Sequence, residues 1–164
     1  MLIRDVTLAD ATAIVEIYNY YIQSSHATFE LETSTTIEME QRLTENIARG
    51  FPFLVAEMDD KLAAYAYARP FRPRAGYRFA AEIAAYVRPG FERRGLGQGL
   101  YRRLIPQLFN DGFHTLIATI ALPNDASVFL HEKFGFKKAG HFREVGRKFE
   151  RWIDVGYWQL FSQT

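Results

Sequence analysis

Three glycines at alternate positions stand directly in front of a helical repeat, and they constrain the fold more than any other feature of the chain. They are Gly95, Gly97 and Gly99 in the segment ERRGLGQGLYRRL, which spans residues 92–104. A strand-like apolar run ends just before this segment at Val87, and leucines at helical spacing follow it. Glycine is a poor helix former, so its use here indicates backbone that must stay bare.

A strand, a glycine loop and a helix in this order are typical of phosphate binding. The first N–H groups of a helix have no partner within the helix and carry partial positive charge. They can close on phosphate oxygens only where side chains stay out of the way. The segment is not a Walker loop, because no Gly-Lys-Ser/Thr follows, and Gly-x-Gly-x-x-Gly never occurs. A tight turn without a ligand is the alternative explanation of the glycines alone.

Hydrophobic patterns along the rest of the chain predict helices placed between strands. Strands are expected at LIRDV, FPFLVAEM, KLAAYAYARP, YRFAAEIAAYV, FHTLIATIAL and RWIDVGYWQLF. Helices are expected after the capping box TLAD, from TTIE to Arg49, after the glycine segment, and within NDASVFLHEKFG. Pro106 should bend the third helix or remove one of its hydrogen bonds. This order of elements indicates one domain over residues 1–164 built on a mixed α/β sheet.

Composition narrows the classes of function. The 20 basic and 19 acidic residues nearly cancel, so the total charge does not indicate a nucleic-acid or membrane partner. Arginines nevertheless gather in the middle of the chain, which suggests an anionic ligand there, although solvated surface arginines would give the same pattern. These arginines are Arg69, Arg72, Arg74, Arg78, Arg88, Arg93 and Arg94.

Several chemistries lack the residues that they need. The chain has no cysteine, which excludes a disulfide scaffold, a thiolate metal site and a cysteine nucleophile, and which fits an intracellular protein. No Gly-x-Ser-x-Gly elbow is present, and the four histidines do not have metal-ligand spacing, so no metal is expected. No apolar run reaches membrane-spanning length, and we expect a cytoplasmic protein.

The glycine segment also carries a family resemblance. Arg94-x-x-Gly97-x-Gly99 is similar to the signature of the GNAT superfamily of acetyl-CoA-dependent N-acetyltransferases. The segments ATFELE, PFRPRAGYR, AYVRPGFERRGLGQGL, LPNDASVFLHEKFGF and FREVGRKFERWIDVGYWQL resemble the phosphinothricin and methionine-sulfoximine acetyltransferase branch. Together they cover the chain from about Ala27 to its end. The resemblance implies the GNAT fold, a single mixed, mostly antiparallel sheet of about six or seven strands, splayed near Val87, with helices on both faces.

The resemblance further implies that acetyl-CoA lies in the opening of the sheet. The glycine segment would hold its pyrophosphate, the strand end at residues 85–87 would pair with its pantetheine arm, and the Val87 N–H would face the thioester oxygen. Asn124 would contact the pantetheine region, although a plain helix cap is an equal alternative. The expected acetyl-CoA contacts are Ala85, Tyr86, Val87, Arg93, Arg94, Gly95, Leu96, Gly97, Gln98, Gly99, Asn124 and Lys133.

Acetyl transfer to an amine needs a base for the amine proton and an acid for the departing thiolate. Glu82 is the one acidic residue in the strand FAAEIAAYV, where burial would raise its pKa, and the resemblance makes it the general base. A structural ion pair with an arginine such as Arg78 is the alternative. Many relatives carry a tyrosine where this chain has His131, so His131 is the candidate acid, and a packing role in the helix is equally open.

The loop PFRPR is the candidate recognition site for the acceptor. Arginines in a proline-restricted loop can clamp a carboxylate or a tetrahedral oxygen group. The resemblance implies direct acetylation of the α-amino group of an amino acid such as methionine sulfoximine, methionine sulfone or phosphinothricin. The expected acceptor contacts are Phe71, Arg72, Pro73, Arg74, Glu82, Ile83 and Ala84.

The sequence is compatible with two other functions. The acetyl-CoA segment does not define the acceptor, so protein amino termini or other amines are possible acceptors. Arginines interleaved with aromatics in RPFRPRAGYRF would suit a nucleic-acid-binding module, which the balanced charge argues against. The resemblance also implies a homodimer, for which the aromatic carboxy-terminal segment with Trp152, Tyr157 and Trp158 offers surface.

Overall fold

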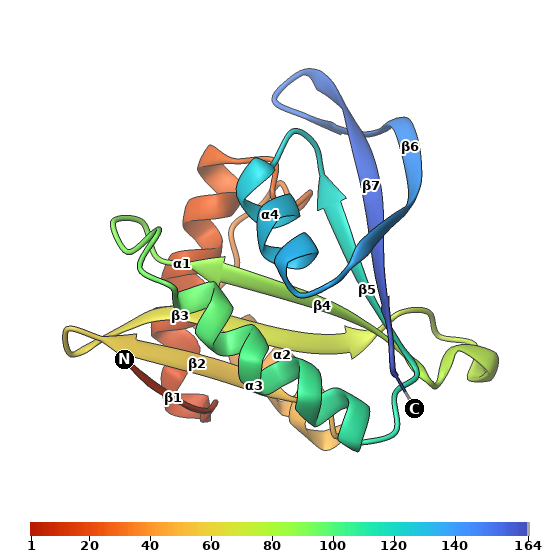
Figure 1. The fold of residues 1–164 in the computed structure, drawn as a ribbon. Helices are drawn as coiled ribbons and strands as arrows, with labels where there is room; N and C mark the ends of the chain where they lie inside the picture. The colour runs from red at the N-terminus through yellow and green to blue at the C-terminus, as the bar shows by residue number, and fades with distance from the viewer. Residues whose placement is uncertain (164) are drawn as a thin grey trace.

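The computed structural model describes residues 1–163 and contains one seven-stranded sheet with helices on both faces (Figure 1). The order across the sheet is β1-β2-β3-β4-β5-β7-β6, and only the β4–β5 pair is parallel. The expectation of a mixed, mostly antiparallel sheet is confirmed. The strands are β1 (Leu2–Asp5), β2 (Phe53–Met58), β3 (Lys61–Pro70), β4 (Ala80–Val87), β5 (Thr115–Ala121), β6 (Lys137–Lys148) and β7 (Arg151–Phe161).

Two hydrophobic cores lie on opposite faces of the sheet. One packs α3 and the short α4 against the central strands, and the other packs α1 and α2 against β2 and β3. The helices are α1 (Ala11–Ser24), α2 (Thr36–Ala48), α3 (Leu96–Asn110) and α4 (Asp125–Lys133), with 3-10 turns η1 (Leu8–Asp10) and η2 (Ala75–Tyr77). Within residues 1–163, no helix is long and apolar enough to cross a membrane.

Local sequence explains the start of α2 and the turn between β2 and β3. The Thr35 side chain accepts a hydrogen bond from the Glu38 N–H, and the Glu38 side chain accepts one from the Thr35 N–H, which completes a capping box at the start of α2. Asp59 and Asp60 both have positive φ, which suits the tight β2–β3 turn. Helix α3 continues through Pro106, where one backbone donor is missing.

The parallel pair β4–β5 is short, and this opens the sheet. The register pairs residues 80–82 of β4 with residues 115–117 of β5 and then stops. Beyond Glu82 the two strands diverge, β4 toward α1 and β5 away from it (Figure 1). The opening therefore starts earlier along β4 than its expected position near Val87.

Strand β6 is the element that hydrophobic periodicity does not reveal. It lies at the sheet edge beside β7, and most of its side chains are exposed. Register shifts between Lys138 and Gly140 and between Phe142 and Gly146 interrupt the two-residue alternation. An exposed and irregular edge strand lacks the pattern on which strand prediction depends. Strand β4 also starts later than expected, because Tyr77 belongs to η2.

Candidate active site

A cleft of about 420 Å³ lies in the opening between β4 and β5. Its walls come from both diverging strands, the start of α3, helix α4 and the end of α1. Among the residues that line it are Tyr21, Ser25, His26, Ala27, Ile83, Ala84, Ala85, Tyr86, Val87, Arg93, Gly97, Tyr101, Asn124, Ser127, Leu130 and His131.

The backbone of β4 presents hydrogen-bonding groups to this cleft. The Arg88 N–H donates to Ala63 O at 2.7 Å on the β3 side. Because backbone groups alternate along an antiparallel pair, the N–H groups of residues 83, 85 and 87 point toward β5, which has already diverged. The Val87 carbonyl accepts from the Tyr21 hydroxyl at 2.7 Å. An extended ligand with amide groups can therefore form hydrogen bonds with the free backbone edge of β4 in this cleft.

The three alternate glycines serve different purposes. Gly95 has φ +79° at the N-cap of α3, a conformation that other residues rarely adopt. A Cβ on Gly97 would lie 3.1 Å from Leu130 Cδ2, so this glycine lets α3 approach α4 at the cleft. A Cβ on Gly99 would instead meet Met1 and Ile3, away from the cleft. Of the three, Gly97 is the one that lines the cleft, and the expected contacts of Gly95 and Gly99 with acetyl-CoA stay predictions.

Of the other acetyl-CoA contacts expected in the glycine segment, one lines the cleft and the rest lie outside its lining. Arg93 lines the cleft, whereas Arg94 forms an ion pair with Asp59 of the β2–β3 turn at 2.8 Å. Leu96 is buried in the core on the α3 face. Gln98 is partly buried and is not part of the cleft lining.

Of the two acetyl-CoA contacts expected at α4, one lines the cleft and the other lies outside it. Asn124 lines the cleft, and its Oδ1 accepts from the Ser127 N–H at 3.1 Å, so it is an N-cap in this structure. Lys133 is exposed near the Phe129 ring, outside the cleft lining.

His131 forms a buried pair with Tyr101 at the base of the cleft. Since a carbonyl can only accept, His131 donates from Nδ1 to Ser127 O at 2.8 Å, and its Nε2 accepts from the Tyr101 hydroxyl at 2.9 Å. Desolvation lowers the pKa of His131 to about 4, because burial penalises the charged form. The imidazole is therefore neutral at pH 7. These contacts favour the packing role for His131, and its role as an acid stays a prediction.

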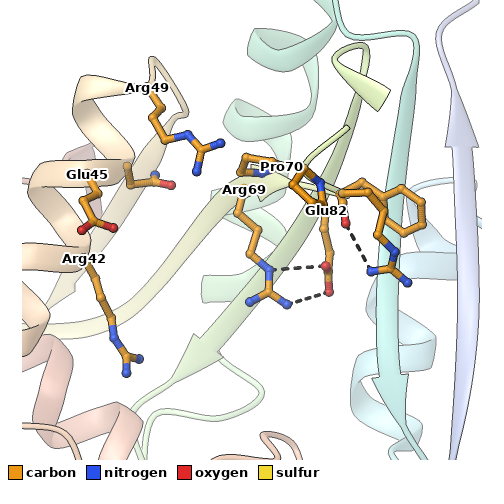
Figure 2. A pocket seen from close by; sticks show the side chains of 10 residues that line it. Arg42, Glu45, Arg49, Arg69, Pro70 and Glu82 are labelled. Atoms are coloured by element: carbon orange, nitrogen blue, oxygen red, sulfur yellow. Dashed lines mark hydrogen bonds and ion pairs between the residues drawn. The ribbon is translucent and has the colours of Figure 1, made fainter. Parts of the chain in front are cut away.

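A second cavity of about 450 Å³ lies against β3, β4 and α2 (Figure 2). Glu82 projects into it from β4, while the next residues, Ile83 and Ala84, line the cleft. The carboxylate therefore belongs to the second cavity, and Glu82 directly precedes the β4 residues that line the cleft. Arg69 of β3 holds it with two hydrogen bonds of 2.9 and 3.3 Å, so its partner is Arg69 and not Arg78.

The recognition loop contributes part of the wall of this cavity. Phe71, Arg72 and Pro73 line it, and the Arg72 guanidinium lies 4.6 Å from the centroid of the Phe71 ring. Arg74 does not line the cavity and instead precedes η2 in an extended conformation. The structure thus separates the two arginines of PFRPR.

Sequence reasoning missed the contribution of α2. Arg42, Asn46 and Arg49 lie on one face of this helix, or just past its end, and line the cavity opposite Glu82 (Figure 2). Their spacing of about one helical turn was the signal that could have identified them. Arg42 also forms a two-hydrogen-bond ion pair with Glu30 at 3.0 and 3.2 Å.

An adjoining pocket of about 280 Å³ shares Arg42, Asn46 and Arg69 with this cavity. Its floor is aromatic, from Tyr18, Phe53, Tyr65 and Tyr67. Burial raises the pKa of the Tyr65 and Tyr67 hydroxyls, which therefore stay neutral at pH 7. The two spaces together combine a cationic rim with an apolar floor.

Comparison with known proteins places this geometry in context. A family model described as an acetyltransferase (GNAT) domain matches residues 3–156. Phosphinothricin N-acetyltransferase of Streptomyces viridochromogenes is 40% identical over 157 residues, which cover 96% of this chain and 85% of that protein. The L-methionine sulfoximine/L-methionine sulfone acetyltransferase of Salmonella typhimurium is 36% identical over 163 residues, which cover 98% and 94%.

Solved structures are similar over almost the whole chain. A ribosomal-protein-alanine N-acetyltransferase from Brucella melitensis superposes with a TM-score of 0.96 at 35% identity, covering 99% of this chain and 100% of that one. A GNAT superfamily phosphinothricin acetyltransferase from Sinorhizobium meliloti, solved with acetyl-CoA, has a TM-score of 0.95 at 32% identity and covers 98% and 87%. The expected fold is confirmed by these structures.

The Gly97→Ala substitution tests the close approach of α3 and α4. The new Cβ would displace Leu130 on the wall of the cleft, and we expect acetyl-CoA affinity to fall about tenfold, as measured by calorimetry. Gly99→Ala is the matched control, because its Cβ meets the flexible end of the exposed Met1 side chain. Equal affinities of the two variants would contradict this assignment.

Protonation of His131 should make folding stability depend on pH. The unfolded chain binds this proton near pH 6.5 and the folded chain only near pH 4. The contribution of the neutral His131 to the free energy of unfolding is therefore complete above pH 6.5 and is lost as pH falls toward 4. Between pH 7 and pH 5 the loss is about 2 kcal/mol. His131→Gln keeps an acceptor for Tyr101 and does not titrate. Urea unfolding should show a loss smaller by about this amount in the variant, and equal losses would refute the neutral-histidine interpretation.

Proposed function

The chain belongs to the GNAT acetyltransferase family and is an acetyl-CoA-dependent N-acetyltransferase, and we propose that its acceptor is the α-amino group of a small amino acid with a polar, tetrahedral side-chain head. Phosphinothricin, methionine sulfoximine and methionine sulfone are acceptors of this kind. The observation that carries the proposal is the position of Glu82 in the arginine-lined cavity, directly before the β4 residues that line the β4–β5 cleft.

The cleft has the groups that an acetyl-CoA molecule requires. The N–H groups of Ala85 and Val87 are available to the amides of the pantetheine arm and to the thioester oxygen. The first turn of α3 at Gly95 and Gly97, with Arg93 beside it, suits the pyrophosphate. This fit supports the cleft as the acetyl-CoA site.

Glu82 is the proposed base for direct transfer. The acceptor nitrogen attacks the thioester carbonyl, Glu82 removes its proton directly or through water, and the thiolate leaves. Arg69 orients the carboxylate through two hydrogen bonds. The chain has no cysteine and no serine nucleophile motif, so we propose sequential kinetics without a covalent acetyl-enzyme. The neutral His131 keeps the Tyr101 hydroxyl in place beside the cleft.

Charge in the cavity supports an anionic acceptor. Four arginines line it, namely Arg42, Arg49, Arg69 and Arg72, against the two glutamates Glu45 and Glu82. The excess positive charge suits a carboxylate together with a polar oxygen-bearing head. We propose that Arg72 contacts one of these groups, and that the aromatic floor of the adjoining pocket packs against the methylene chain.

Acetylation of protein amino termini is the second candidate. It is favoured by the high similarity to the Brucella melitensis structure, which bears the name of a ribosomal-protein-alanine N-acetyltransferase. Thiol release with methionine sulfone, phosphinothricin and alanine-initiated peptides separates the two candidates. Much faster turnover of the peptides would overturn the amino-acid assignment while leaving the acetyl-CoA site intact.

We also propose that residues 1–164 act as one domain, and as a homodimer in the cytoplasm. Exposed apolar side chains on the β6–β7 hairpin support the dimer; they are Phe142, Val145, Phe149 and Trp152. Trp158 is buried in the core and cannot contribute. The absence of cysteine fits a reducing compartment. Light scattering measures the oligomeric state.

The Glu82→Gln variant tests the base. Glutamine keeps the shape of the side chain and an oxygen for Arg69 but cannot accept the proton, so kcat should fall at least about 100-fold. The KM for acetyl-CoA should stay close to that of the wild-type protein. Glu40→Gln on the exposed side of α2 is the control and should be fully active. A fully active Glu82→Gln variant would remove Glu82 from the mechanism.

The Arg72→Ala and Arg74→Ala variants test acceptor recognition. Arg72 lines the cavity, so its loss should cost roughly 1.5 to 3 kcal/mol of transition-state binding, the scale of one charge-assisted hydrogen bond. Arg74 lies outside the lining, and its loss should have a smaller effect. The measurement is kcat/KM on methionine sulfone at saturating acetyl-CoA. Full activity in both variants would count against a small anionic acceptor.

A further inference from the structure

Lys148, the last residue of β6, is a buried lysine that the chemistry described above does not use. Only 3% of its surface is exposed. Its Nζ donates to the main-chain carbonyls of Ser25 at 2.7 Å and Thr28 at 2.8 Å, and makes a longer contact of 3.5 Å with Tyr21 O. An ammonium has three donors, and here all of them face carbonyl oxygens.

These carbonyls belong to one short stretch, the end of α1 and the turn that follows it. The carbonyl end of a helix carries partial negative charge, which a cation stabilises. Burial without partners would be costly for the ammonium, and desolvation lowers its pKa. Lys148 therefore ties residues 21–28 to a hairpin more than a hundred positions away in the chain.

A second contact joins the same two segments. The Phe29 ring packs directly onto Gly146, where any Cβ would overlap the ring. Strand β6 thus holds the turn after α1 at two points, through the Lys148 ammonium and through the bare backbone of Gly146. Inside the turn, the Thr28 hydroxyl also forms a buried hydrogen bond of 3.0 Å with the Tyr18 hydroxyl.

The stretch that Lys148 holds is one wall of the β4–β5 cleft. Tyr21, Ser25, His26 and Ala27 line it. The Tyr21 hydroxyl donates to Val87 O at 2.7 Å, next to the N–H groups that face the cleft. His26 donates from Nε2 to Pro123 O at 2.8 Å and so connects this wall to the loop before α4. The contacts of Lys148, Tyr21 and His26 therefore link the hairpin, the end of α1, β4 and the loop before α4 around the cleft.

We propose that Lys148 is a positioning residue for acetyl-CoA binding, which acts by fixing the carbonyls of residues 21–28 so that Tyr21 and His26 close one side of the cleft. The inference rests on the proposed function, because it takes the cleft as the acetyl-CoA site. Lys148 has no role in the proton transfers. Its loss should alter acetyl-CoA affinity much more than the chemical step at saturation.

The test compares Lys148→Met with the wild-type protein by calorimetry and steady-state kinetics. Methionine fills the space but donates no hydrogen bond. The Kd and KM for acetyl-CoA should rise about tenfold, with kcat at saturating acetyl-CoA within about twofold of wild type. Lys137→Met, at the exposed start of the same strand, is the matched control and should bind acetyl-CoA as the wild type does. A lysine that only supports the fold would lower Tm without this split between KM and kcat.

Two further measurements identify the route of the effect. His26→Ala should weaken acetyl-CoA binding by itself, and the double variant with Lys148→Met should lose less than the product of the two single losses, since both act on one wall. Amide hydrogen exchange over residues 21–28 should accelerate in Lys148→Met, and acetyl-CoA should slow it again. Lys148→Gln, which keeps a shorter neutral donor, replaces Lys148→Met if that variant does not fold.

The outcomes separate this inference from the proposed function. If wild-type protein binds acetyl-CoA and a folded Lys148 variant binds it equally well, the positioning role is wrong and the acetyl-CoA site stands. Unchanged exchange over residues 21–28 in such a variant would also overturn the positioning role. If wild-type protein does not bind acetyl-CoA, the proposed function fails, and the inference fails with it.

Discussion

The divergence of β4 from β5 after Glu82 is the constraint on which the rest of the site depends. A backbone N–H that loses its strand partner must find another acceptor or remain in contact with water. Here the unpaired groups of β4 face a cleft that α3, α4 and the end of α1 enclose. The interrupted sheet thus creates a binding edge in the middle of the protein, where edge strands are normally absent. The start of α3 then adds its own unpaired N–H groups to the same space.

Glu82 stands where the paired and unpaired parts of β4 meet. It is the last β4 residue in register with β5, and its side chain lines the cavity against α2, while the next residues, Ile83 and Ala84, line the cleft. Consecutive residues of β4 therefore line the two spaces. Arg69 pairs with this carboxylate from the neighbouring strand, and Arg42 pairs with Glu30, while Arg49 and Arg72 also line the cavity. If Glu82 is the base, as proposed, this arrangement suits a transfer reaction in which the two substrates occupy the neighbouring spaces.

Buried polar groups around the cleft hold its walls without adding charge to it. His131 is neutral and bridges Tyr101 and Ser127, and the Nζ of Lys148 donates to carbonyl oxygens at the end of α1. Of the described residues, no buried side-chain nitrogen or oxygen lacks a hydrogen-bond partner. Such satisfied networks favour one arrangement of the surrounding backbone. In this protein they connect α4 to α3, and the β6–β7 hairpin to the end of α1, around one cleft.

Local patterns by themselves determined the helices, the regular strands, the glycine segment and the acidic residue on β4, because periodicity and capping depend on neighbours in sequence. They did not reveal β6, whose exposed and bulged course lacks alternation. Only the tertiary structure decided that Arg69 is the partner of Glu82, that Arg42 and Arg49 face it from α2, and that His131 is neutral. It also gave Gly99 a packing role at β1. These properties depend on burial and on contacts between segments distant in the chain, which no local pattern contains.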